Sequence, residues 1–290
     1  MSKPVVVGVD GSDSAEQAVR WAAREAAHRG APLRLVHSCL VIEAYTPVTL
    51  PVSVSEALAD QGRDWLRHAA RLAQEAAPGV DVSAHLDHGS AAACLIAESE
   101  SAELVVLGSR GLGGFTGLVV GSVALALSTH GYCPVVVVRG EHDRTGQPVV
   151  VGVDSSPASD AAIGFAFEEA ARLGVPLVAQ HTWTDLSLYV KFSLAPYGVN
   201  WAQVDKEQER LLTERLAGWR EKYPQVALQF AVTAGRAAHS LLEAARVAQL
   251  VVVGSRGRGG VAGMLLGSTS QALLHHSPCA VAVVRPDTEG

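Results

Sequence analysis

Two stretches of this chain carry one glycine pattern and decide its fold: GSRGLGGFTGLVVGS at 108–122 and GSRGRGGVAGMLLGS at 254–268. In each, a glycine, two residues, a second glycine, nine residues and a Gly-Ser pair follow in order. Each stretch follows an apolar run, 104–107 or 250–253, that is typical of a strand buried in a parallel sheet. A strand, a glycine loop and a helix start commonly hold phosphate, because free N–H groups at the helix start point at the anion. The pattern therefore predicts one nucleotide site in each half of the chain.

The repeat extends well beyond the glycine pattern. An offset of 146 residues relates Cys133 to Cys279, and an offset of 144 relates Asp10 to Asp154. Two copies of one domain account for almost the whole chain if they differ by a net two-residue insertion between about residues 38 and 60.

We therefore expect two domains of one fold, at 1–140 and 147–290. Each has about the commonest size of a protein domain and is long enough to bury a core of its own. The expected linker is 140–147, GEHDRTGQ, because this segment is polar, charged and rich in glycine.

Composition limits the class of protein. The 290 residues are 48% hydrophobic and 18% charged, which is typical of a compact soluble protein. The net charge of −6 leaves no basic footprint, so we expect no nucleic-acid partner. The first apolar run, 5–9, is too short for a signal peptide or a membrane span, so we expect a cytoplasmic protein without a membrane partner. The 4 cysteines lack metal-binding spacing, and we expect free thiols and no metal site.

Apolar and helical patterns alternate along the first copy. Strands are expected at 4–9, 33–37, 80–86, 104–107 and 135–138, and helices at 13–29, 56–77, 90–100 and 122–129. Ser12 and Ser156 are suited to cap the first helix of each copy, Pro157 to open the second of these, and Gly30 to end the first. The alternation predicts an α/β fold with a doubly wound parallel sheet in each domain. If strands one and four flank the switch in strand order, Asp10 faces the first glycine loop across one crevice.

The glycine pattern differs from two better-known phosphate loops. It lacks the third glycine of G-x-G-x-x-G, and no lysine precedes Ser122 or Ser268 as a Walker motif requires. The residues instead offer a cradle of backbone N–H groups, serine hydroxyls and the loop residues Arg110 and Arg256. The alternative interpretation is that these glycines serve only tight turns and helix packing.

With these motifs in place, the chain resembles the universal stress protein family in its tandem-domain form. The resemblance covers VVVGVDGS at 5–12, VVVGVDSS at 149–156, both glycine stretches and the final strands CPVVVVR and CAVAVVR. G-x2-G-x9-G-[ST] marks the ATP-binding branch of that family. The resemblance implies a five-stranded parallel sheet of order 3-2-1-4-5 in each domain, and ATP as the ligand. We expect Mg²⁺ with the ATP, because this ion is usually held by few carboxylates together with phosphate.

The resemblance also implies which residues form each site. Asp10 and Asp154 would lie near the ribose and adenine, Ser38 and Thr182 would flank the adenine after strand two, and the glycine stretches would hold the phosphates. The candidate nucleotide-binding residues are Gly8, Asp10, Ser38, Gly108, Ser109, Arg110, Gly111, Gly121, Ser122 and Val123, and in the second copy Gly152, Asp154, Thr182, Gly254, Ser255, Arg256, Gly257, Gly267, Ser268 and Thr269. Asp10 and Asp154 could alternatively be turn residues that only stabilise a helix. We assign no catalytic residue, and we expect His37 and His181 to pack in the core.

Two functions follow from these residues. The first is a regulatory, stress-response protein that binds an adenine nucleotide in each domain with little or no turnover, since no positioned base or nucleophile stands beside the loops. The second is a slow ATPase or an adenylating or ATP-pyrophosphatase-type enzyme, faintly suggested by GVDGSDS at 8–14. The apolar last strands, 135–138 and 281–284, would be sheet edges, so we also expect an internal pseudo-dimer of the two domains and a possible homodimer.

Overall fold

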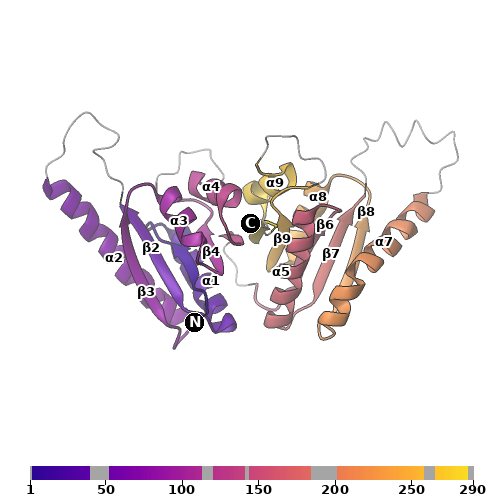
Figure 1. Ribbon diagram of the computed structural model, residues 1–290, viewed down its shortest axis with the longest axis horizontal. Coiled ribbons are helices and arrows are strands. Elements are labelled where there is room, and N and C mark those ends of the chain that lie inside the picture. The colour runs from indigo at the N-terminus through magenta and orange to yellow at the C-terminus, as the bar shows by residue number, and fades with distance from the viewer. Residues whose placement is uncertain are drawn as a thin grey trace. The chain divides into compact units, whose positions relative to one another are not determined.

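The computed structural model describes residues 2–39, 52–112, 120–140, 144–183, 201–257 and 265–286. These residues belong to two compact units, unit 1 (Met1–Arg139) and unit 2 (Gly140–Gly290). Both units alternate strands with helices along the chain (Figure 1).

Unit 1 is built around a parallel sheet. Its elements are β1 (Val5–Gly8), α1 (Asp13–Arg29), β2 (Leu33–Cys39), α2 (Val52–Ala76), β3 (Val82–His88), α3 (Ala91–Ser99), β4 (Leu104–Gly108), α4 (Ser122–His130) and β5 (Val135–Val138). The strands pair in the order β3-β2-β1-β4-β5, and every one of these pairings is parallel. Helices α1 and α2 pack against each other, as do α3 and α4, so two helical layers cover the sheet.

Unit 2 repeats this arrangement. Its elements are β6 (Val149–Val153), α5 (Pro157–Leu173), β7 (Leu177–Thr182), α7 (Trp201–Lys222), β8 (Leu228–Thr233), α8 (Ala237–Ala244), the 3-10 helix η3 (Ala245–Val247), β9 (Leu250–Gly254), α9 (Ser268–His276) and β10 (Ala280–Val284). The pairings run β8-β7-β6-β9-β10, again all parallel. The predicted α/β class and the strand order 3-2-1-4-5 are therefore confirmed.

Local chemistry fixes where the first helix of each unit begins. Ser12 Oγ accepts the N–H of Ala15 at 3.2 Å, and Ser156 Oγ accepts the N–H of Ser159 at 3.2 Å, ahead of Pro157. These side chains occupy the N-cap position, where they satisfy N–H groups that have no partner within the helix. The predicted starts of the first helix in each unit, α1 and α5, are confirmed.

Several element bounds differ from the prediction by one to four residues, and one of these differences moves a candidate residue. Strand β2 continues to Cys39, because its pairing with β3 extends through Ser38 and Asp87. Ser38 therefore lies inside the strand and not after it, and Thr182 is likewise the last residue of β7. Helix α2 begins at Val52 and not at residue 56.

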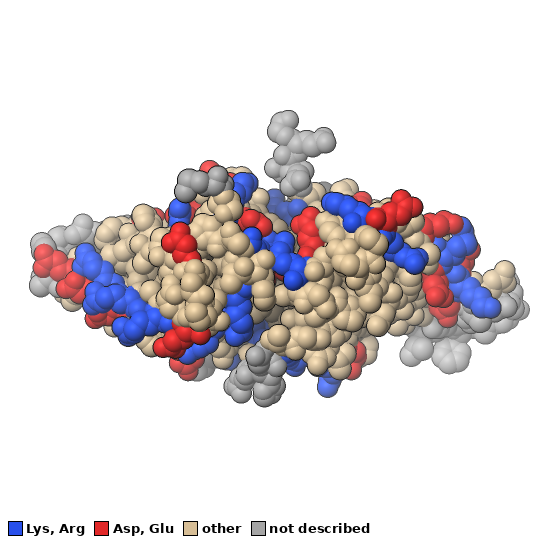
Figure 2. Space-filling view, turned by 90° about the horizontal axis from the view of Figure 1, so that it is seen from below, with Lys and Arg blue, Asp and Glu red and all other residues tan. Residues whose placement is uncertain are grey.

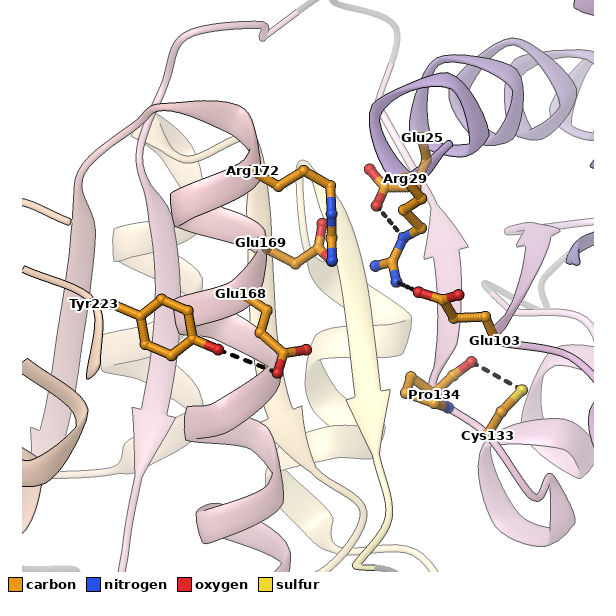
Figure 3. A network of polar contacts seen from close by, with 9 residues as sticks. All are labelled: Glu25, Arg29, Glu103, Cys133, Pro134, Glu168, Glu169, Arg172 and Tyr223. Atoms are coloured by element: carbon orange, nitrogen blue, oxygen red, sulfur yellow. Dashed lines mark hydrogen bonds and ion pairs between the residues drawn. The ribbon is translucent and has the colours of Figure 1, made fainter. Parts of the chain in front are cut away.

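A charged cluster of unit 1 lies among buried residues. Glu25 in α1 is only 3% exposed, and Arg29 Nε donates to it at 2.5 Å. Arg29 Nη1 also donates to Glu103 at 2.6 Å, so this arginine joins the end of α1 to the residue that precedes β4 (Figure 3). Buried carboxylates need such partners because the loss of hydration is costly.

The end of the predicted linker is fixed on unit 2. Arg144 Nη1 donates to the carbonyl oxygens of Ala245, Arg246 and Ala248 at 2.9, 2.9 and 3.2 Å. These carbonyls stand at the C-terminal end of α8 and η3, where cations and donors are favoured. Residues 141–143 of the linker lie outside the described residues.

The surface of the described residues is mixed in charge. On the face drawn in Figure 2, basic and acidic side chains are interspersed. Among the helices in the described ranges, none is long and apolar enough to cross a membrane.

Candidate functional site

A cavity of about 450 Å³ opens in unit 1 at the carboxyl ends of the central strands. Strand β1 pairs with β2 on one side and with β4 on the other, so the strand order switches direction here. Sheets of this type bind ligands at that switch. Nine of the ten candidate residues of the first copy line the cavity: Gly8, Asp10, Ser38, Gly108, Arg110, Gly111, Gly121, Ser122 and Val123.

One part of the lining is apolar. Val36 lies opposite Gly8 in the β1–β2 register, and a Cβ at Gly8 would stand 2.7 Å from Leu107 and 3.1 Å from Leu95. These four residues all line the cavity together with Ala91. They form an apolar wall on the α3 face of the sheet, and sequence analysis missed all of it except Gly8.

The Asp10 carboxylate holds the glycine loop in place. Its Oδ1 accepts the N–H and the hydroxyl of Ser12 at 3.1 and 2.6 Å, and its Oδ2 accepts the N–H of Leu112 at 3.1 Å. The first two contacts form an Asx turn before α1, and the third joins this turn to the loop after β4. Asp10 is therefore both a turn residue and a cavity residue.

Two glycines of the loop are required by packing alone. A Cβ at Gly108 would lie 2.6 Å from the backbone carbonyl of Ser14, and a Cβ at Gly111 would collide with the Asp10 carboxylate. Ser14, which sequence analysis also missed, accepts the Arg110 N–H at 3.3 Å through its hydroxyl. Packing by itself therefore accounts for glycine at positions 108 and 111.

Gly121 is different. It caps α4 with φ −69° and ψ 148°, which any residue adopts, and among the described residues beyond its two chain neighbours a Cβ there would meet Ser109 O first, at 3.9 Å. Neither the backbone angles nor these described neighbours therefore require glycine at this position. The first turn of α4 closes with Leu125 N–H on Gly121 O, so the N–H groups that precede it in the helix have no partner there. The space that a Cβ would fill lies beside these donors.

The same framework recurs in unit 2. Asp154 Oδ1 accepts the N–H and hydroxyl of Ser156 at 2.8 and 2.6 Å. A Cβ at Gly254 would lie 2.7 Å from the backbone of Ala158, and one at Gly257 would lie 2.7 Å from Asp154 Oδ2. These contacts repeat those of Gly108 and Gly111.

The second helix-capping glycine also repeats the first. Gly267 has φ −72° and ψ 152°, and among the described residues a Cβ there would first meet Arg256 Cα, in van der Waals contact at 3.4 Å. Its N–H donates to Ser255 O at 2.8 Å, as Gly121 N–H donates to Ser109 O at 3.0 Å. Ser109, the candidate outside the cavity lining, and Ser255 thus close the two loops. Ser268 and Thr269 begin α9 directly after Gly267, and Arg256 lies in the loop before it.

The universal stress protein family model matches residues 1–139 and 146–285. The chain belongs to the universal stress protein family. A universal stress protein of Mycolicibacterium smegmatis is 40% identical over 290 residues, covering 97% of both chains. One from Mycobacterium tuberculosis strain H37Rv is 40% identical over 299 residues, covering 98% of this chain and 99% of its own. The tandem-domain prediction is therefore confirmed.

A solved structure shows the same fold. The universal stress protein of Archaeoglobus fulgidus superposes with a TM-score of 0.73 at 19% identity, covering 98% of both chains. At this identity the similarity concerns the fold alone.

In this universal stress protein, His37 and His181 each contact a backbone carbonyl oxygen of their own unit. His37 Nδ1 lies 2.7 Å from Val9 O, and its ring meets Trp65 edge-on with centroids 5.2 Å apart. His181 Nδ1 lies 2.8 Å from Val153 O. Both rings therefore tie β1 or β6 to the next strand, which supports the packing role.

Two charged or polar groups near the cavity have shifted pKa values. Burial, and then the positive charge of Arg110, lower the pKa of Arg139, which follows β5. Burial, and then the hydrogen bond to the Asp87 carboxylate at 2.9 Å, raise the pKa of the Cys94 thiol to about 12. Cys94 is therefore a poor nucleophile. Within the described ranges, no group of three or more His, Cys, Asp or Glu residues could hold a metal ion.

Proposed function

We propose that this universal stress protein is a regulatory protein of the stress response that binds one ATP, with Mg²⁺, in each unit and turns it over slowly or not at all. The observation that carries the proposal is the room at Gly121 and Gly267. Neither the backbone angles nor the neighbours in the described part of the chain require glycine there, yet both copies have it. A ligand that approaches the backbone closely supplies the missing reason.

The surroundings of this space suit phosphate. Helix α4 begins at Ser122, so its unpaired N–H groups and the Ser122 hydroxyl can donate to phosphate oxygens. Arg110 lines the same cavity and adds a positive charge. Among the described lining residues Asp10 is the one carboxylate, and Mg²⁺ is commonly held by one or two carboxylates together with the phosphates themselves.

The apolar wall suits a nucleobase. Val36, Leu95 and Leu107 stand beside Gly8 and line the same cavity as the α4 start. A flat base placed against these side chains is removed from water, while the phosphates reach the glycine loop. The volume of about 450 Å³ lies within the range of small-molecule sites, roughly 300–1,000 Å³.

The polar lining residues support binding without fast turnover. Both Asp10 oxygens already accept hydrogen bonds from the loop and turn, and His37 Nδ1 contacts Val9 O. General-base catalysis requires a group free to take a proton from the attacking water or hydroxyl. The Asp10 carboxylate, which the loop and turn already engage, is not placed as such a base, so we favour the regulatory function over the enzyme.

Thermal unfolding with and without ATP and Mg²⁺ tests the proposal. Ligand at 100 times its dissociation constant stabilises a one-site protein by about 2.7 kcal/mol, so we expect a clear rise in the unfolding temperature. Phosphate release measured on the same samples should stay far below roughly 1 s⁻¹, the low end for ordinary enzymes. An unchanged unfolding temperature at millimolar ATP would contradict nucleotide binding, and fast phosphate release would contradict the regulatory function.

A further inference from the structure

The cavity wall of unit 1 changes character in unit 2. Most lining positions are the same or similar in the two copies, but four apolar residues become polar. Ala15, Val36, Val123 and Ala124 correspond to Ser159, Gln180, Thr269 and Ser270. An added polar group in a ligand wall either bonds within the protein or is available to the ligand.

Two of these four residues are serines whose hydroxyls form hydrogen bonds with the loop framework. Ser159 Oγ accepts the N–H of Asp154 at 3.0 Å, and Ser270 Oγ donates to Gly254 O at 2.7 Å. Both hydroxyls therefore support the loop framework and need no ligand.

Gln180 stands at the base wall of unit 2. It lies opposite Gly152 in the β6–β7 register, as Val36 lies opposite Gly8 in unit 1. A Cβ at Gly152 would meet Leu241 at 3.0 Å and Val253 at 3.2 Å, the counterparts of Leu95 and Leu107. Gln180 is 6% exposed, so its amide is almost withdrawn from bulk water.

A chain of hydrogen bonds fixes which way the amide points. Ser240 Oγ donates to Arg236 O at 3.4 Å, and Thr233 Oγ1 donates to Ser240 Oγ at 3.0 Å. Since each hydroxyl has a single proton, Thr233 Oγ1 must accept from Gln180, and Nε2 of Gln180 donates to it at 2.9 Å. Ser240 belongs to α8, so the amide lies on the α8 face of the sheet, the face of the base wall.

One atom of this amide is left unused. Nε2 makes a second, longer contact with His181 O at 3.4 Å, which accounts for both of its hydrogens. Oε1 accepts no hydrogen bond from any residue in the described parts of the chain. Because the residue as a whole is only 6% exposed, a ligand N–H that reaches Oε1 would give this oxygen a donor in place of its remaining contact with water.

We propose that Gln180 makes the unit 2 site selective for nucleobases that carry an exocyclic amino group, whereas the Val36 wall of unit 1 does not read that group. The inference rests on the proposed nucleotide function. Adenine would donate its 6-amino N–H to Gln180 Oε1, and an analogue lacking the amino group would leave the oxygen unpaired. The two units would then differ in base selectivity while sharing one phosphate cradle.

The test compares ATP with purine riboside triphosphate, which lacks the 6-amino group, in calorimetric titrations with Mg²⁺. Gly121→Ala blocks the unit 1 cradle and isolates the unit 2 site, and Gly267→Ala isolates the unit 1 site. In Gly121→Ala we expect ATP to bind about tenfold more tightly than the analogue, and in Gly267→Ala about equally.

Gln180→Leu in the Gly121→Ala background should bring the affinity ratio of the two ligands close to one. Because both ligands are compared on one variant, a partial loss of folded protein affects them alike. If the leucine variant folds poorly, Gln180→Val, which introduces the residue found in unit 1, provides a second measurement of the affinity ratio. Gln229→Leu, at an exposed amide near the start of β8, is the matched control and should keep the tenfold ratio.

Equal ratios in the two isolated units, or a tenfold ratio that survives Gln180→Leu, would overturn the inference and leave the proposed function standing. A failure of the unsubstituted chain to bind either triphosphate would overturn both.

Discussion

Units 1 and 2 keep the same glycine framework and change the wall around it. In both, one glycine packs against the backbone of the following helix, one lies beneath an aspartate carboxylate, and one caps a helix where a Cβ would meet no described atom closer than 3.4 Å. The four changed wall positions instead exchange apolar for polar side chains. The comparison shows that backbone geometry tolerates little change, because a single Cβ collides with main-chain atoms. Side chains of the wall vary as long as their polar atoms find partners.

The largest effect is expected where a glycine touches the backbone. Gly108→Ala and Gly254→Ala each force a Cβ to within 2.6–2.7 Å of main-chain carbon atoms of Ser14 or Ala158. Overpacking of this kind costs about 1–3 kcal/mol, and more where the backbone must move. Each variant should unfold at clearly lower urea concentration than the parent. Gly218→Ala is the matched control, because a Cβ there meets no described atom within 4 Å. Gly30→Ala is unsuitable as a control, because the positive φ of 59° at Gly30 would strain an alanine. Parent-like stability of Gly108→Ala would show that the helix yields easily.

The second-largest effect on stability is expected at the turn that Asp10 forms with Ser12. Asp10→Ala removes the acceptor for the Ser12 N–H and hydroxyl and for the Leu112 N–H, and we expect a loss of about 1–2 kcal/mol in the free energy of unfolding. Asp10→Asn keeps Oδ1 as an acceptor for Ser12 and should lose less than half of that. Chemical denaturation of the three proteins measures the difference. Equal losses for alanine and asparagine would mean that the charge, and not the turn, matters.

A smaller effect separates the two walls. Ser270→Ala gives unit 2 the residue of unit 1 and removes a hydrogen bond of 2.7 Å to Gly254 O, which should cost about 1 kcal/mol. The reciprocal Ala124→Ser in unit 1 tests whether the same bond can form there. If Ser270→Ala is as stable as the parent, the hydroxyl is available to a ligand after all.

The smallest expected effect concerns thiol chemistry. The pKa of Cys94 is raised to about 12, mainly by burial and then by Asp87, so the thiol should react very slowly with iodoacetamide at pH 8. Asp87→Asn removes the negative charge and should lower this pKa, which speeds alkylation by about tenfold for each unit of pKa. Mass spectrometry locates the label. Cys133, whose pKa burial raises to about 12, serves as the internal control and should stay unlabelled in both proteins. Fast labelling of Cys94 in the parent would contradict the assignment.

The fold could be predicted from sequence because strand and helix periods are local signals, and because the repeat displays each of them twice. The glycine loop and Asp10 could be predicted from the spacing of residues at strand ends. The different roles of Gly108 and Gly121 could not, since the neighbour of Gly108 is Ser14, 94 positions away in the sequence. Gln180 was missed because its place beside Gly152 depends on the pairing of β6 with β7, which the sequence alone does not show.

That difference also decides which glycine variant is informative. Alanine at Gly108 disturbs packing, so a loss of binding there would not distinguish a cradle from a damaged fold. Alanine at Gly121 or Gly267 would collide with no described atom, since a Cβ lies 3.9 Å from Ser109 O in the first case and 3.4 Å from Arg256 Cα in the second.

The most direct measurement is therefore the stoichiometry of ATP binding, with Mg²⁺, by calorimetric titration of four proteins of matched stability. We predict two sites in the parent, one in Gly121→Ala, one in Gly267→Ala and none in the double variant. Two sites retained in the folded double variant would contradict the account, because the space beside the two capping glycines would then hold no part of the nucleotide.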